Sequence, residues 1–195
     1  GKMFRSNEIG VQNSIDPSLL QYEGRNYLVW GSFRGIYVIE LTADGLSIMS
    51  GAKKKRIAGT AFEAVYIHKH GDYYYMFASI GSCCQGVKST YKVVVGRSKK
   101  VWGPYKDKTG KPMLKNGYSL VIGANDHFVG NGHGSQIIQD DAGQDWLLYH
   151  GFSRSTPENG RILLLDQIKW DQEGWPYVEG GSPSYETQKA PVFNN

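Results

Sequence analysis

The chain has 195 residues, enough for one medium-sized domain with a hydrophobic core, and 40% of them are hydrophobic, which excludes an intrinsically disordered protein. The formal net charge of +4 comes partly from two basic runs, residues 52–56 and 97–100. Both runs stand between strand-like segments, so we interpret them as solvated loops and expect no nucleic-acid partner. No apolar run approaches the ~20 residues of a membrane-spanning helix, so we expect no membrane partner.

The segments of regular structure are short and rich in β-branched and aromatic residues, and turn residues bound each of them. In chain order they are residues 27–33, 35–41, 64–69, 73–80, 90–98, 135–139, 145–152 and 162–170. The chain also holds 25 glycines and 25 aromatic residues, a mixture typical of short strands joined by tight turns. We find no amphipathic helix of ten or more residues. The sequence therefore predicts an all-β protein.

One structural unit recurs three times along the chain. In each copy an apolar segment meets a hairpin glycine (Gly24, Gly71 and Gly143), and an aromatic-rich segment and further strands follow. The spacings of 47 and 72 residues, with about four strands a unit, are typical of the blades of a β-propeller, although a β-sandwich would share some of this pattern.

The number of repeats is too small for a closed propeller. We place the blades near residues 13–58, 59–101 and 131–180, with a long connection over 102–130. Closed propellers have about four to eight blades, and three would leave unpaired strand edges. We therefore expect residues 1–195 to be part of a larger propeller domain whose N-terminal blades are missing, supplied by another segment or a companion chain.

Two carboxylates and a histidine occupy corresponding places in the three repeats. Asp16 and Glu63 each stand eight residues before the hairpin glycine, and His133 precedes the third copy. Equivalent strands of different blades begin at the same mouth of a propeller channel, so we expect the three side chains to converge. Converged carboxylates serve glycoside hydrolysis or metal binding. The alternatives are a turn residue before Pro17 for Asp16 and a surface charge for Glu63.

Other candidate motifs carry less weight. Cys83 and Cys84 are adjacent, and their expected Cα separation of about 3.8 Å is below the usual disulfide span, so we predict two free thiols rather than a strained bond. Residues 140–145 are rich in aspartate but lack the spacing of a calcium loop, and we interpret them as a hairpin turn. Two cysteines without paired histidines give no zinc pattern.

Several blocks together resemble glycoside hydrolase family 43, and most closely its endo-α-1,5-L-arabinanases. The blocks are NSIDPSLL, GSFRGIYVIEL, FEAVYI, SCCQGVKSTYKVVVGRS, GPYKDKTGKPML, GNGHGSQIIQDDAGQDWLLYH and IKWDQEGWPYV. The resemblance covers almost the whole chain. It implies a five-bladed propeller, of which this chain supplies about three blades, and an enzyme that cleaves α-1,5-linked L-arabinofuranosyl bonds of plant cell-wall arabinan with inversion. An extracellular or periplasmic location follows from the polymeric substrate.

The resemblance also assigns roles to residues. Asp16 corresponds to the carboxylate that modulates the pKa of the general acid and orients it, and Glu63 corresponds to that acid. His133 corresponds to the histidine that holds a calcium or sodium ion. Ser32 and Phe33 fall in a segment that lines the sugar subsites, and Cys83 falls in a loop close to them.

The chain departs from the family pattern in three places. The family's general base lies near the N-terminus, on blades that this chain lacks. Glu63-Ala64-Val65 replaces a common Glu-Ala-Pro, and GNGHGS around His133 replaces a common Gly-Pro-Gly-His-Asn. Three alternatives remain beside an endo-arabinanase: an exo-acting arabinofuranosidase or xylosidase, a non-catalytic glycan-binding propeller, and a fragment that is inactive without its missing blades.

Overall fold

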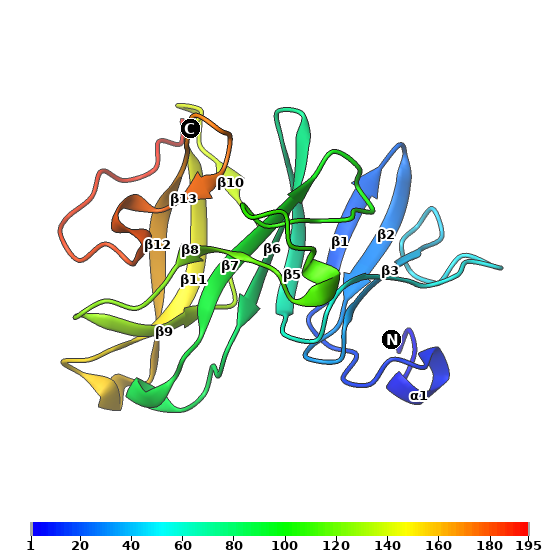
Figure 1. The fold of residues 1–195 in the computed structure, drawn as a ribbon, viewed down its shortest axis with the longest axis horizontal. Coiled ribbons are helices and arrows are strands. Elements are labelled where there is room, and N and C mark those ends of the chain that lie inside the picture. The colour runs from blue at the N-terminus through cyan, green and yellow to red at the C-terminus, as the bar shows by residue number, and fades with distance from the viewer. Residues whose placement is uncertain (1, 195) are drawn as a thin grey trace. The chain divides into compact units, whose positions relative to one another are not determined.

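The computed structural model describes residues 2–194, and its regular secondary structure consists mainly of antiparallel strands (Figure 1). The chain forms two compact units. The first unit contains the residues up to Ala78 together with Gly96–Tyr118, and the second contains Ser79–Val95 together with the residues from Ser119 onward. The predicted all-β class is confirmed.

The first unit holds a four-stranded sheet in the order β1-β2-β3-β4. Its strands are β1 (Ser18–Tyr22), β2 (Arg25–Trp30), β3 (Ile36–Glu40) and β4 (Lys55–Ala58). Gly24 forms the hairpin turn between β1 and β2 with a φ of +73°, a conformation that glycine adopts without steric cost. One face of the sheet packs in a core that contains Leu28, Trp30 and Ile39.

A second four-stranded sheet has the order β5-β6-β7-β8. Its strands are β5 (Glu63–His70), β6 (Tyr73–Ile80), β7 (Lys92–Ser98) and β8 (Ser119–Ile122). The boundary between the two units falls within β6 and within β7. The middle of β6 and the middle of β7 are fully buried, as their unbroken runs of apolar residues predict.

The third sheet lies in the second unit and contains an interrupted edge. Its strands are β9 (Phe128–Gly132), β10 (Ile138–Gln139), β11 (Asp145–Ser153), β12 (Arg161–Trp170) and β13 (Pro176–Tyr177). Both β9 and β10 pair with β11, so together they act as one strand with a break at residues 133–137. His133 is the first residue of this break.

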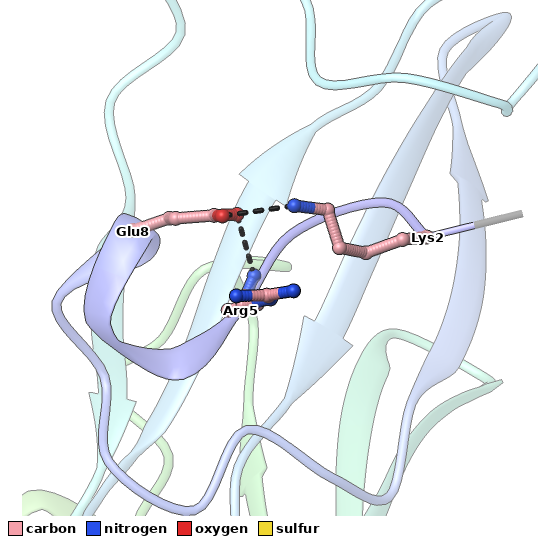
Figure 2. A network of polar contacts seen from close by, with 3 residues as sticks. All are labelled: Lys2, Arg5 and Glu8. Atoms are coloured by element: carbon pink, nitrogen blue, oxygen red, sulfur yellow. Dashed lines mark hydrogen bonds and ion pairs between the residues drawn. The ribbon is translucent and has the colours of Figure 1, made fainter.

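Helices are few and short in the described part of the chain. They are α1 (Ser6–Ile9) and the 3₁₀ turns η1 (Gly86–Lys88), η2 (Met113–Lys115), η3 (Pro157–Asn159) and η4 (Glu179–Gly181). The Glu8 carboxylate accepts hydrogen bonds from the backbone N–H of Arg5 and the Lys2 ammonium, both at 2.8 Å, which fixes the start of α1 (Figure 2). Among residues 2–194, no helix has the length and apolar character needed to cross a membrane.

Two predictions about local structure need correction. Cys83 and Cys84 are not free thiols, because they form a disulfide with each other across a Cα–Cα distance of 3.8 Å. The surrounding loop is drawn together where the backbone N–H groups of Thr90 and Tyr91 both donate to the carbonyl of Ser82. Sequence spacing gives only the Cα separation and contains nothing about this loop geometry.

The basic runs are also not wholly loops. In the first run Lys55 and Arg56 begin β4, and in the second run Arg97 and Ser98 end β7. The connection predicted over residues 102–130 contains β8 and most of β9. In the basic runs and in β9, pairing with a neighbouring strand extends regular structure into residues of low strand propensity, whereas β8 contains an apolar run at residues 120–122.

Candidate active site

Asp16 and Glu63 lie at the beginnings of two strands in the first unit. Asp16 stands two residues before β1, and Glu63 is the first residue of β5. The Oδ2 atom of Asp16 accepts a hydrogen bond from the backbone N–H of Ala64 at 3.1 Å. This bond joins the two strand beginnings, so the structure brings together the two carboxylates that the repeat analysis singled out.

Ser32 ties a third strand to the same place. It follows β2, its side chain is fully buried, and its hydroxyl donates to Oε2 of Glu63 at 2.8 Å. Glu63 itself is only 8% exposed. A buried carboxylate is costly unless hydrogen bonds satisfy it, so Ser32 supports both the burial and the orientation of Glu63.

Backbone hydrogen bonds fix the segments that carry these side chains. The N–H of Phe33 donates to the carbonyl of Phe62 at 2.9 Å, which binds the Ser32 segment to the residue before Glu63. The side-chain amide of Asn13 donates to the carbonyl of Ser32 at 3.0 Å, which binds the same segment to the approach to Asp16. The candidate site therefore rests on three mutually hydrogen-bonded segments.

Backbone strain is concentrated in these segments. Four non-glycine residues here adopt a positive φ: Asn13 (54°), Asp16 (54°), Phe33 (51°) and Ala64 (49°). Such conformations are uncommon for residues with a Cβ, cost about 1–3 kcal/mol each, and persist only where the surroundings impose them. Strain of this kind clusters at functional sites, which supports the assignment of a site to these residues.

The arrangement suits acid–base chemistry. The carboxylate of Glu63 is nearly buried at the beginning of β5. The half-buried carboxylate of Asp16 accepts a hydrogen bond from the backbone N–H of Ala64, the residue after Glu63. A half-buried aromatic ring, Phe33, follows Ser32 directly in the chain. A carboxylic acid held in a fixed direction can protonate a leaving group when a substrate lies against it.

His133 lies in the second unit and is held differently. Its backbone has a φ of +51°, and its N–H donates to Oγ of Ser79 at 2.8 Å. Its exposed imidazole faces the ring of His150 at a centroid distance of 6.3 Å, and His150 in turn stacks on Tyr91 at 5.7 Å. Burial, with smaller contributions from Arg161 and His133, lowers the pKa of His150 to about 4, so His150 is neutral at pH 7.

The surroundings of His133 are compatible with a hydrated cation. Calcium and sodium prefer oxygen ligands and often retain water. Two buried polar atoms in adjacent strands, Asn131 Oδ1 and His150 Nδ1, have no hydrogen-bond partner within residues 2–194. Buried polar atoms of this kind are usually satisfied by ordered water, and the water shell of an ion would also satisfy them. A neutral His150 adds no positive charge that would oppose a cation.

Cys83, also predicted to lie near substrate, belongs to the loop between β6 and β7 in the second unit. Both cysteines are at least partly accessible, and their disulfide makes them an uncharged part of the loop surface. Of the predicted site residues, the structure thus groups Asp16, Ser32, Phe33 and Glu63 in one unit and places Cys83 and His133 in the other.

A pair of histidines on β5 was missed by the sequence analysis. His68 and His70 are two residues apart and therefore point to the same face of the strand. Their nitrogen atoms lie within 4.8 Å of each other, close enough to bind one metal ion. The H-x-H spacing on a predicted strand is the signal that could have identified them.

Comparison with known proteins identifies relatives along almost the whole chain. The family model described as "Glycosyl hydrolases family 43" matches residues 1–176. An extracellular exo-α-(1→5)-L-arabinofuranosidase of Cellvibrio japonicus is 40% identical over 183 residues, covering 86% of this chain and 52% of that protein. An extracellular endo-α-(1→5)-L-arabinanase of Bacillus subtilis is 36% identical, covering 90% of this chain and 54% of the relative.

Two of the solved structures that match this chain are also arabinanases. The structure of a Cellvibrio cellulosa α-L-arabinanase complexed with arabinohexaose matches with a TM-score of 0.78 and 36% identity, covering 85% of this chain and 57% of that one. An exo-1,5-α-L-arabinanase from a bovine ruminal metagenomic library matches with a TM-score of 0.77 and 38% identity, covering 84% of this chain and 56% of that one. The chain therefore spans about half the length of the relatives that it matches.

Proposed function

The chain belongs to glycoside hydrolase family 43, and we propose that the protein that carries it hydrolyses α-1,5-linked L-arabinofuranosyl bonds of arabinan with inversion of configuration. The names of the relatives, which include both endo- and exo-acting enzymes on α-1,5-linked arabinose, support this substrate class. The observation that carries the proposal is the hydrogen-bonded group of Asp16, Ser32 and Glu63.

Glu63 is the proposed general acid. In this role its carboxylic acid protonates the glycosidic oxygen as the bond to the leaving sugar breaks. Ser32 holds Oε2 of Glu63 and so fixes the direction of the carboxyl group. Asp16 orients the first turn of β5 through the Ala64 amide, and its negative charge favours the proton-carrying form of a nearby acid.

The general base is proposed to come from outside residues 1–195. An inverting glycosidase needs a second carboxylate about 6.5–9.5 Å from the acid, with a water molecule between it and the sugar. The relatives are about twice as long as the segment that they share with this chain, so the remaining half, in the same polypeptide or a companion chain, is the proposed source.

We propose that the complete protein is a five-bladed propeller. We assign its blades near residues 13–58, 59–101 and 131–180, one to each antiparallel sheet, although the second sheet also includes β8 and the third begins with β9, outside these bounds. His133 is the proposed contact of a calcium or sodium ion, while Phe33 and Cys83 line sugar subsites. The word "extracellular" in the names of two relatives supports secretion as the proposed location.

The test is the substitution Glu63→Gln in the full-length protein. Glutamine keeps the size of the side chain and can still accept the Ser32 hydrogen bond, but it cannot supply a proton. We expect turnover of linear α-1,5-arabinan to fall by about 10²–10⁴-fold with an unchanged melting temperature. Chromatography of the products distinguishes endo action, which releases oligosaccharides, from exo action, which releases a single sugar size.

Glu179→Gln is the matched control, because Glu179 is an exposed partner of Lys169 and its substitution removes the same charge. Near-normal arabinan hydrolysis by the Glu63→Gln protein would refute the assignment of the acid. Binding of arabinan without any hydrolysis by the unsubstituted full-length protein would instead identify a glycan-binding propeller.

A further inference from the structure

A groove opens on the first unit beside the sheet β1–β4. It has a volume of about 200 Å³, and its walls come from β2, β3, the segment leading into β4, and Trp102 of the loop after β7. The lining residues are Tyr27, Val38, Ile39, Glu40, Ala52, Lys53, Lys55 and Trp102. Typical pockets for drug-sized ligands measure about 300–1,000 Å³, so this groove is suited to a single small ring.

Aromatic rings form one wall of the groove. Trp102 packs against Tyr27 at a centroid distance of 4.6 Å and against Tyr22 at 5.9 Å. These contacts hold the indole in a fixed position on the sheet. A rigid, half-buried indole beside charged groups offers both an apolar surface for the C–H face of a sugar ring and polar atoms for its substituents.

The charged residues give the groove a net positive character. Glu40 is already paired with Arg25 at 3.3 Å, whereas Lys53 and Lys55 have no ion-pair partner in the described part of the chain. Lys54, between them, donates instead to the carbonyl of Ile9 at 2.8 Å. Two unpaired ammonium groups therefore stand at a groove with a fixed aromatic wall.

We propose that this groove binds a uronic acid residue of an acidic polysaccharide. The ring of the sugar packs on Trp102, and its carboxylate pairs with Lys53 and Lys55. A neutral sugar would leave both ammonium groups without a partner, so the charge of the groove selects an anionic one. The volume suits a single ring, so the remainder of the polymer would lie outside the groove.

The inference goes beyond the proposed hydrolysis and does not depend on it. The groove residues belong to β2, β3, the segment leading into β4, β4 itself and the Trp102 loop, and none of the hydrogen bonds described above for Asp16, Ser32 and Glu63 within residues 2–194 involves them. Binding here would retain the protein on an acidic polymer while another part of it acts on a different chain. The exposed charges predict weak binding that salt suppresses.

The test is affinity electrophoresis of the full-length protein in native gels that contain polygalacturonate, with gels that contain neutral linear arabinan or dextran sulfate in parallel. The double variant Lys53→Gln/Lys55→Gln removes the paired ammonium groups. The control Lys111→Gln/Lys115→Gln removes two exposed charges from a loop outside the groove. We expect polygalacturonate to retard the unsubstituted and control proteins alike, and the groove variant at least several-fold less.

Equal retardation of the two double variants would overturn the proposal, because it would indicate attraction by net charge alone. Retardation by dextran sulfate as strong as by polygalacturonate would overturn the selection of a uronic acid. Trp102→Phe provides a second measurement, since loss of the indole should weaken retardation while both lysines remain. Arabinan hydrolysis by the groove variant should equal that of the control, so failure of this proposal is distinguishable from failure of the proposed function.

Discussion

The two units hold their candidate functional residues in different ways. In the first unit, Glu63 is nearly buried, and its carboxylate accepts a hydrogen bond at 2.8 Å from a fully buried serine. In the second unit, the His133 side chain is exposed, its backbone N–H donates a hydrogen bond to Ser79, and its ring stacks on a neighbouring imidazole. The carboxyl group of Glu63 is therefore fixed in direction, whereas the imidazole of His133 retains freedom to change its orientation.

This difference matches the chemistry proposed for each place. A general acid must point at one oxygen atom, and small errors in its position are costly. A contact to a hydrated ion tolerates movement, because water molecules complete the coordination of calcium over a range of geometries. Substitutions should therefore have large effects in the first unit and smaller, ion-dependent effects in the second.

The largest effect after loss of Glu63 itself is expected for Asp16→Asn. Asparagine can still accept the hydrogen bond from the Ala64 amide through its Oδ1 atom, and it tolerates the positive φ of this position. Only the negative charge is lost, and we expect kcat on arabinan to fall about 10²-fold. Unaltered kcat with a raised KM would show that Asp16 acts only in substrate binding.

A smaller effect is expected for Ser32→Ala. The substitution removes the hydroxyl that donates to Glu63 and leaves the nearly buried carboxylate with one donor fewer. Hydrogen bonds to charged groups contribute about 1.5–3 kcal/mol, which corresponds to roughly a 10–100-fold loss of activity. The pH–rate profile provides the check: a displaced acidic or basic limb supports an effect through Glu63, and an unchanged profile contradicts it.

The smallest effect is expected for His133→Asn. Asparagine accepts the left-handed backbone of this position, so the break in the third sheet should remain intact. We expect less than about a 10-fold loss of activity at saturating calcium, the low end for residues that act through a metal. Titration with a chelator should inactivate the variant at a lower chelator concentration than the unsubstituted protein, because the variant has lost one contact to the ion, and equal responses would contradict an ion at His133.

Much of the fold could be predicted from the sequence because its signals are local. The hairpin glycines Gly24, Gly71 and Gly143 all occur at turns with positive φ, and the apolar segments beside them form strands. Strand β9 was missed, because the residues Gly130, Asn131 and Gly132 have low strand propensity. They form a strand because β11 offers them hydrogen-bonding partners, which is information carried by another part of the chain.

The candidate site was predictable only in part, because several of its contacts join segments that are distant in the sequence. The repeat placed Asp16 and Glu63 in equivalent positions, but it contained no sign that Ser32 would donate to Glu63 across 31 residues. The disulfide of Cys83 and Cys84 depends on the conformation of one loop. The groove beside Trp102 requires residues from four segments to meet, and each segment alone has an ordinary composition.

The break between β9 and β10 has a consequence for how the third sheet tolerates changes in length. From Gly132 to Ile138 the chain advances six residues, while the paired positions on β11 move back by four, from His150 to Trp146. The surplus is absorbed in the break, so insertions or deletions there need not shift the pairing of β11 with β12. The segment after His133 is thus a point where loop length can vary between homologous proteins while the β-sheet around it stays in register.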